Sequence, residues 1–172
     1  MAQSRAESVP AAPSLEFAFA IDAKVDPPTA IGGPTGTSAL TFQRHFVPIT
    51  GGTVTGPLLE GAVLPHSGDF LTKEYIEEAD GRTSVVYSVH ARYLIRANDG
   101  AVIEIDNKGF WVGTKEQDDS SAASDPKTYY FRTQPVFRTT APAYQWLTRT
   151  IFVGTAEDHL DGYIRIKLYK VL

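Results

Sequence analysis

Two long alternating runs, at residues 83–97 and 100–112, dominate the pattern of hydrophobic and polar positions along this chain. In each run apolar residues occupy every second position, which is the period of a β-strand with one buried face. Asn98-Asp99-Gly100 joins the two runs. Asp-Gly is typical of a tight hairpin turn, because such a turn needs positive φ angles that glycine adopts at no cost. The same pair recurs at Asp80-Gly81 and Asp161-Gly162, so the pattern predicts consecutive antiparallel hairpins.

Further strands are predicted where Val, Ile, Tyr, Phe and Thr cluster between turn signals. These segments cover residues 15–22, 40–49, 52–63, 69–78, 128–138, 145–155 and 162–171. The segment 69–78 would also fit two helical turns, but the Asp-Gly turn that follows it favours a strand. Pro57 suggests an edge, a bulge or a bend within its run, because proline cannot donate a backbone hydrogen bond.

Eight or nine antiparallel strands in one chain must either pack as a sandwich or close into a barrel. Long strands, tight turns and a sequential order favour a closed up-and-down barrel, which leaves no exposed strand edges, over a Greek-key sandwich. The predicted fold is therefore all-β, with a disordered tail at residues 1–13 and one barrel domain at 14–172. A barrel of about eight strands can hold one small ligand. The acidic segment 114–127 is either a lid or a solvated insertion, and its composition favours the insertion.

Composition narrows the classes of function. The 172 residues carry 16 basic and 20 acidic side chains, a net charge of −4, and no basic patch for nucleic acid stands out. No apolar stretch approaches the roughly 20 residues that a membrane-spanning helix needs. The first residues lack the apolar core of a secretory signal, and the absence of cysteine excludes disulfides and thiolate chemistry. We therefore expect a cytoplasmic protein that binds neither nucleic acid nor membrane.

The familiar catalytic and cofactor motifs are missing from the sequence. It contains no Gly-x-Ser-x-Gly elbow, no phosphate-binding loop and no dinucleotide fingerprint that opens a helix. The glycine-rich segment 32–36 contains Pro34 and is followed by no helical pattern. The four histidines, at positions 45, 66, 90 and 159, form no pair with the spacing of metal ligands. We therefore expect no cofactor and no metal site.

Five local patterns follow one another along the chain. They are Gly51-Gly52 with Gly56-Pro57 and Gly61; Leu64-Pro65 with Gly68-Asp69-Phe70; Arg92-Tyr93-Leu94-Ile95-Arg96 with Asp99-Gly100-Ala101; Tyr130-Phe131-Arg132-Thr133 with Pro135 and Phe137; and Tyr144-Gln145-Trp146-Leu147 with Phe152-Val153-Gly154. Together they resemble the domain-of-unknown-function family 3237 (DUF3237), from about residue 15 to the C-terminus. The resemblance implies a compact, often self-associating antiparallel barrel with a pocket in or at its mouth, and it implies no particular reaction. Two departures are Phe70, where the family commonly has tryptophan, and the long segment 114–127.

Polar residues on the predicted strands supply the candidate site. One face of strand 83–97 is largely apolar and includes Tyr93, whereas the other carries His90 and Arg92, and the sequence alone does not orient them. If the mixed face lines the interior, Arg92 needs a partner because an unpaired buried charge is very costly, and Asp69 is the candidate. Arg132, which follows the aromatic run 129–131, is a second candidate cation. The ordinary alternatives are a solvated arginine and a turn aspartate.

The leading hypothesis is a cofactor-independent enzyme that isomerises, cyclises or eliminates within a small hydrophobic oxygenated molecule. Asp69 would act as general base or acid, Arg92 or Arg132 would stabilise negative charge, and Tyr93 would relay a proton. The residues expected to contact the substrate are Tyr130, Trp146, Phe70 and His90, although core packing is the ordinary role of Trp146. The alternatives are a non-catalytic carrier of a similar ligand, and a structural module whose aromatic faces bury an interface. We expect a homo-oligomer, a dimer or larger.

Overall fold

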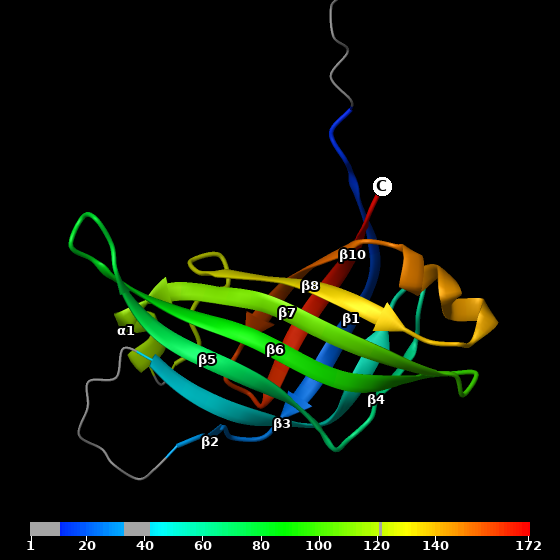
Figure 1. Cartoon of the computed structure of the whole chain (residues 1–172), viewed down its shortest axis with the longest axis horizontal. Helices are drawn as coiled ribbons and strands as arrows, with labels where there is room; N and C mark the ends of the chain where they lie inside the picture. The colour runs from blue at the N-terminus through cyan, green and yellow to red at the C-terminus, as the bar shows by residue number, and fades with distance from the viewer. Residues whose placement is uncertain (1–10, 33–41, 121) are drawn as a thin grey trace, which may run out of the picture.

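The computed structural model describes residues 11–32, 42–120 and 122–172, so most of the predicted tail and of the glycine-rich segment 32–36 lies outside the described residues. Within them the chain forms antiparallel strands and two short helices (Figure 1). The strands are β1 (Leu15–Val25), β2 (Thr29–Ala30), β3 (Phe42–Thr55), β4 (Gly61–Val63), β5 (Ser67–Glu77), β6 (Thr83–Ala97), β7 (Val102–Thr114), β8 (Tyr130–Arg138), β9 (Phe152–Asp158) and β10 (Tyr163–Val171). The helices are α1 (Lys115–Asp119) and the 3₁₀ helix η1 (Pro142–Arg149). The all-β antiparallel prediction is confirmed.

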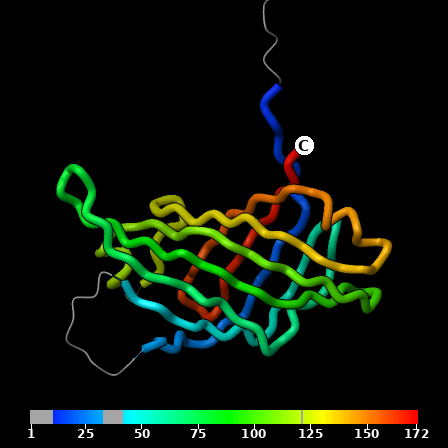
Figure 2. Tube along the Cα trace, in the orientation of Figure 1, coloured from blue at the N-terminus to red at the C-terminus, as the bar shows by residue number. Residues whose placement is uncertain are grey.

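The strands pair around a ring, so that the pairings followed from β5 return to β5. Strands β5 to β10 pair consecutively, β10 pairs with β1, β1 with β3, and β3 with β5. The short strands β2 and β4 are attached to β3, and β4 also pairs with β6. The ladder between β8 and β9 is the shortest in the ring, with pairs only at Arg132–Thr155 and Thr133–Gly154. The arrangement is barrel-like, with β1 and β10 crossing behind the wall formed by β5 to β8 (Figures 1 and 2).

Strand boundaries follow the sequence pattern where apolar and polar residues alternate strictly, as in β6 and β7. The predicted break at residues 50–52 is wrong, because β3 continues through both glycines to Thr55, and β4 covers only the end of the predicted run 52–63. Gly52 has a φ of +141°, and a Cβ atom there would lie 2.1 Å from the backbone oxygen of Asp22. Glycine therefore bends β3 without ending it and lets β1 approach closely.

Residues 145–155 were predicted as one strand, but residues 145–149 belong to η1 and β9 begins only at Phe152. Pro142 stands at the start of η1, where its missing N–H removes no helical hydrogen bond. Leu147 is buried under the helix, and the ring of Trp146 packs 5.9 Å from that of Phe152. Burial of these side chains therefore favours the helix over an extended run.

The interior is packed at the η1 end and hollow at the α1 end. Near η1, the rings of Phe19 and Phe152 both pack edge-to-face on Phe137, at centroid distances of 5.9 and 5.1 Å. Toward α1 the inward-facing residues of β6 and β7 include Ala91 and Asn107, and a cavity opens there. Within the described residues, no helix has the length and apolar character needed to cross a bilayer.

Candidate functional site

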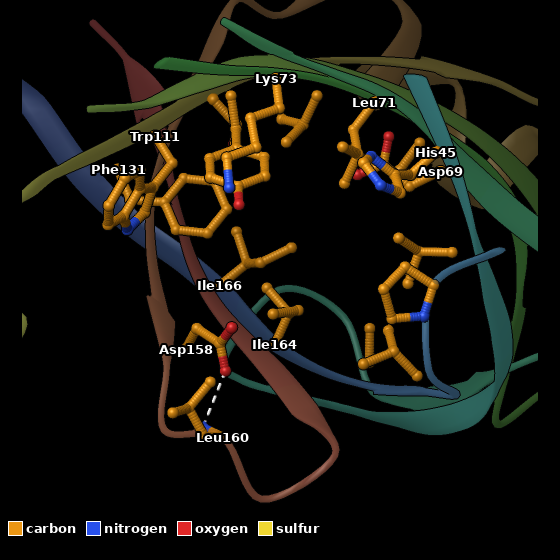
Figure 3. A pocket seen from close by; sticks show the side chains of 18 of the residues that line it. His45, Asp69, Leu71, Lys73, Trp111, Phe131, Asp158, Leu160, Ile164 and Ile166 are labelled. Carbon is orange, nitrogen blue, oxygen red and sulfur yellow. Dashed lines mark hydrogen bonds between the residues drawn. The ribbon is translucent and has the colours of Figure 1, made fainter. Parts of the chain in front are cut away.

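A cavity of about 390 Å³ lies inside the ring of strands (Figure 3). This volume falls within the range of small-molecule sites, about 300–1,000 Å³. Its wall is mostly apolar, and Trp111, Tyr129 and Phe131 supply aromatic surface. The ionisable and polar side chains in the wall include His45, Asp69, Lys73, Tyr87, Tyr93, Asn107, Asp118, Thr133 and Asp158.

Strand alternation explains which residues reach the cavity. On β6 the residues that line it are Tyr87, Val89, Ala91 and Tyr93, and on β5 they are Asp69, Leu71 and Lys73. Successive side chains of a strand point to opposite faces, so the residues between these positions face outward.

Asp69 lies in the wall between β3 and β6. It is paired with Val47 on β3 and with Ala91 on β6. His45 and Tyr93 are therefore its diagonal cross-strand neighbours on the cavity side, a separation that long and aromatic side chains span. In Figure 3, His45 and Asp69 lie together on one side of the cavity.

The surroundings of Asp69 make its carboxyl group titrate near neutrality. Burial raises its pKa from 3.8 to about 6, although Oδ1 accepts a hydrogen bond of 2.7 Å from the backbone N–H of His90, which opposes the rise. Burial, and secondarily the charge of Asp69, raise the pKa of the Tyr93 hydroxyl well above its usual value. The wall thus combines a carboxyl group that can exchange a proton near pH 6 with a phenol that stays protonated.

Four buried polar atoms have no hydrogen-bond partner among the described residues. They are Nδ1 of His45, the hydroxyl of Tyr93, Oδ1 of Asn107 and Oγ1 of Thr133. All four residues line the cavity. Because buried polar groups are normally hydrogen-bonded, these atoms are available to bind water or polar groups of a ligand.

A second polar group connects the cavity wall to α1. The Nζ atom of Lys73 lies 2.5 Å from Oδ2 of Asp118, and the hydroxyl of Tyr87 donates a 2.5 Å hydrogen bond to Oδ1 of the same carboxylate. Burial lowers the pKa of Lys73, but the hydrogen bond to Asp118 outweighs it and holds the pKa above its ordinary value. Burial and the bond to Asp118 raise the pKa of Tyr87 to about 12. Both donors therefore stay protonated at neutral pH.

The acidic segment 114–127 contributes to this wall. Thr114 caps α1 by accepting a hydrogen bond from the backbone N–H of Gln117, whose side chain bonds back to Thr114 and also to Thr128. Gln117, Asp118 and Ser124 line the cavity. The composition favoured a solvated insertion, but the structure places part of the segment against the interior.

Both arginines of the predicted site point away from the cavity. Arg92 is 62% exposed and its guanidinium lies 2.6 Å from Glu104 on the outer face. The guanidinium of Arg132 packs 5.3 Å from the ring centroid of Tyr130, which is itself exposed. The expected pairing of Arg92 with Asp69 is therefore wrong, because the inward face of β6 is the apolar one that carries Tyr93.

The remaining predicted contact residues also lie outside the cavity wall. The ring of His90 bonds to Asp106 at 2.8 Å on the outer face, so only its backbone N–H reaches Asp69. Phe70 is exposed and packs on Phe46. Tyr130 is exposed, and Trp146 packs against the filled end of the interior. Of the eight residues selected from the sequence, the structure brings Asp69 and Tyr93 to the cavity.

Sequence reasoning missed the other ionisable and polar residues of the wall, among them His45, Lys73, Tyr87, Asn107, Asp118, Thr133 and Asp158. A usable signal existed for Lys73, which shares a strand face with Asp69, and for Tyr87, which shares one with Tyr93. In the part of the chain that the structure describes, no group of three or more His, Asp or Glu residues is arranged to hold a metal ion.

Comparisons with known proteins agree with this architecture. A UPF0311 protein of Rhodopseudomonas palustris is 36% identical over 165 residues, which are 93% of this chain and 99% of the relative. The crystal structure of a conserved R. palustris protein of unknown function matches with a TM-score of 0.77 and 32% identity, covering 95% of this chain and all of that one.

Two further crystal structures share the fold. One is a β-barrel-like protein from Acinetobacter baumannii, with a TM-score of 0.72 and 29% identity over 96% of this chain and all of the other. An enzyme from Penicillium herquei matches with a TM-score of 0.64 and 22% identity over 96% and 98% of the two chains, which shows a common fold alone. The family model described as "Protein of unknown function (DUF3237)" matches residues 13–171. This match and the R. palustris relative show that the chain belongs to the DUF3237 family of proteins of unknown function.

Proposed function

We propose that the ring of strands is a closed barrel and that its cavity binds a small, hydrophobic, oxygenated organic molecule. We further propose that the protein is a cofactor-independent enzyme that isomerises, cyclises or eliminates within this molecule. The observation that carries the proposal is the position of Asp69, a carboxyl group with a pKa of about 6 in the wall of an otherwise largely apolar cavity. A perturbed pKa in a cavity is typical of functional sites.

The chemistry that such a wall supports is proton transfer. Asp69 would remove a proton from a C–H or O–H group of the ligand, because both of its protonation states are populated near its pKa. The negative charge that develops on a ligand oxygen would be stabilised by neutral donors, for which the Tyr93 hydroxyl is the candidate. This assignment replaces the arginines of the sequence hypothesis, whose guanidinium groups lie outside.

A non-catalytic carrier would use the same cavity, so only the fate of the ligand separates the two functions. The cavity, with ionisable side chains in its wall, favours a ligand-binding protein over a purely structural module. The enzyme from Penicillium herquei lends the proposal no further weight, because one fold can host many functions. Self-association is proposed for the outer face of β5 to β8, where Phe70, Phe110 and Tyr130 are all more than half exposed.

The experiment is to incubate the purified protein with a panel of polyketide- and terpenoid-like precursors that bear phenol or enol groups. Isomeric or cyclised products would be sought by chromatography with mass detection. Asp69→Asn keeps an acceptor for the His90 N–H and should abolish turnover while ligand binding persists. Asp106→Asn, on the outer face, is the matched control and should keep turnover. Recovery of unaltered ligand from a stable complex would identify a carrier, and unchanged turnover by Asp69→Asn would remove this residue from the mechanism.

A further inference from the structure

Lys73 and Tyr87 present two hydrogen-bond donors that converge on one carboxylate. The two residues stand directly opposite each other in the ladder between β5 and β6. Both donate to Asp118, at 2.5 Å from the ammonium and 2.5 Å from the hydroxyl, one to each carboxylate oxygen. The ammonium also lies 5.1 and 5.4 Å from the ring centroids of Tyr75 and Tyr87. This geometry is that of a binding site for a carboxylate.

The group is withdrawn from solvent, since the side chains of Lys73 and Asp118 are 13% and 4% exposed. A buried ammonium requires a partner, because an uncompensated buried charge is very unfavourable. Whatever occupies the site must therefore supply negative charge. In this structure Asp118 supplies it.

The two sides of this ion pair are anchored very differently. Lys73 and Tyr87 belong to long strands that are paired over most of their length. Asp118 belongs to α1, a helix of only five residues that contains no apolar side chain. Apart from those of Asp118, the side-chain hydrogen bonds of α1 within the described chain run only to residues 114–128. Moving Asp118 therefore requires the displacement of one short helix, whereas moving Lys73 would require the pairing between β5 and β6 to break.

We propose that Lys73 and Tyr87 form a recognition subsite for the carboxylate of an aromatic acid, and that Asp118 occupies this subsite in the free protein. The inference rests on the proposed binding of a small molecule in the cavity, and it names the class of that molecule. The apolar part of the ligand would lie against Trp111, Tyr129 and Phe131, which line the same cavity. Asp69 lines the same cavity from the same strand, with Leu71 between it and Lys73, so the other end of the ligand would lie toward Asp69 (Figure 3).

Asp118 would compete with the ligand carboxylate for Lys73 and Tyr87. Two carboxylates cannot share one ammonium without repulsion, so the ligand carboxylate binds when Asp118 leaves with α1. Replacing Asp118 by asparagine removes the competing charge and leaves the ammonium available. The variant should therefore gain affinity for carboxylates and gain nothing for neutral molecules of the same shape.

The test uses the full chain with two probes of matched shape, naphthalene-2-carboxylate and naphthalene-2-carboxamide, in titration calorimetry. Asp118→Asn should bind the carboxylate at least tenfold more tightly than the unmodified protein does, with little change for the amide. Asp119→Asn is the matched control, because Asp119 lies on the same helix and pairs with Lys115 outside the cavity. Tyr87→Phe and the double variant Lys73→Gln/Asp118→Asn should each lose affinity for the carboxylate relative to their parents.

Hydrogen exchange supplies a readout that does not depend on the stability of any variant. In the unmodified protein, the amides of residues 115–119 should exchange faster when the carboxylate is bound and should not respond to the amide. Equal binding of both probes by all variants, with no change in exchange, would overturn the carboxylate subsite and leave binding in the cavity intact. Failure of every variant to bind either probe would overturn the proposed cavity function itself.

Discussion

Asp69 links the proposed chemistry to the stability of the fold. Its pKa is raised from 3.8 to about 6 by burial, so the folded protein binds the proton more tightly than the unfolded chain does. The stabilising contribution is therefore fully present below pH 3.8 and is lost as the pH rises through about 6. We predict that the unmodified protein loses up to about 3 kcal/mol of unfolding free energy relative to Asp69→Asn across this range. Urea denaturation of both proteins at several pH values would measure this difference. A difference in unfolding free energy that does not change with pH would contradict the prediction.

Arg92 belongs to an outer charge network rather than to the site. Its guanidinium bonds to Glu104, which Arg138 also approaches at 3.4 Å, and all three side chains are at least 30% exposed. Exposed ion pairs of this kind contribute about 0–1 kcal/mol. Arg92→Met should therefore change the unfolding free energy by less than about 1 kcal/mol and leave the affinity for cavity probes unchanged. A loss of probe affinity in this variant, measured by calorimetry, would contradict the assignment of Arg92 to the outer face.

The two-residue period of a strand restricts which of the predicted site residues can share one cavity, and the sequence hypothesis did not apply this restriction. Arg92 and Tyr93 are adjacent on one strand and therefore face opposite sides, so both could not line one cavity. The same rule separates Arg132 from its inward-facing neighbours on β8. Once Asp69 is placed inward, Lys73 must follow, four residues along the strand. Asp118 carried no such signal, because its contact with Lys73 spans 45 positions and depends on how the sheet curves.

At the scale of elements, Gly52 allows three strands to meet. It pairs with Ala23 of β1 and with Val63 of β4, and its φ of +141° is rarely adopted by residues with a side chain. A Cβ atom at this position would overlap the backbone of Asp22. Relaxing this contact would have to separate the paired strands.

We predict that Gly52→Ala lowers the unfolding free energy by more than about 3 kcal/mol, the sum of backbone strain and steric overlap. Gly100→Ala is the matched control. Gly100 also has positive φ, +90°, but a Cβ atom there would meet nothing within 4 Å. The control should cost only the conformational penalty of about 1–2 kcal/mol. Equal losses in thermal or urea denaturation would show that close packing at Gly52 contributes nothing.

Strands could be predicted from the sequence where the alternation of apolar and polar residues matches the alternation of buried and exposed positions. Strands β6 and β7 follow their alternation closely because each has one face in the interior. The segment around Trp146 was misassigned because its aromatic and apolar residues suit a strand as well as a helix. Pro142 and the burial of Leu147 select the helix, and that burial depends on the position of the whole segment over the filled end of the interior.

In the molecule as a whole, the proposed function requires that the ligand bind inside the cavity. Ala91 is the ladder partner of Asp69 and lines the cavity, so a phenyl ring at this position would occupy part of the cavity volume. Ala91→Phe should keep the fold, with a change in unfolding free energy of less than about 1.5 kcal/mol, and should abolish probe binding. Ser88→Phe, on a neighbouring outward position of β6, should bind probes normally. Normal binding by Ala91→Phe would place the ligand elsewhere.

The hollow end of the interior could not be derived from the sequence. The antiparallel pairing of the main strands followed from turns and alternation, which suggested a barrel able to hold a ligand, although the structure has ten strands where eight or nine were predicted. Which end is filled depends on long-range contacts, such as those that bring Phe19 onto Phe137 and Phe152. The location of the cavity therefore had to come from the structure.

The most direct test of the proposed acid–base role is the titration of the Asp69 carboxyl carbon by NMR, with Asp69→Asn used to assign the signal. We predict an inflection near pH 6, because the carboxyl group is buried in the cavity wall. An inflection near 3.8, the value of a carboxyl group in water, would contradict the burial of Asp69 and remove the basis for catalysis at this site.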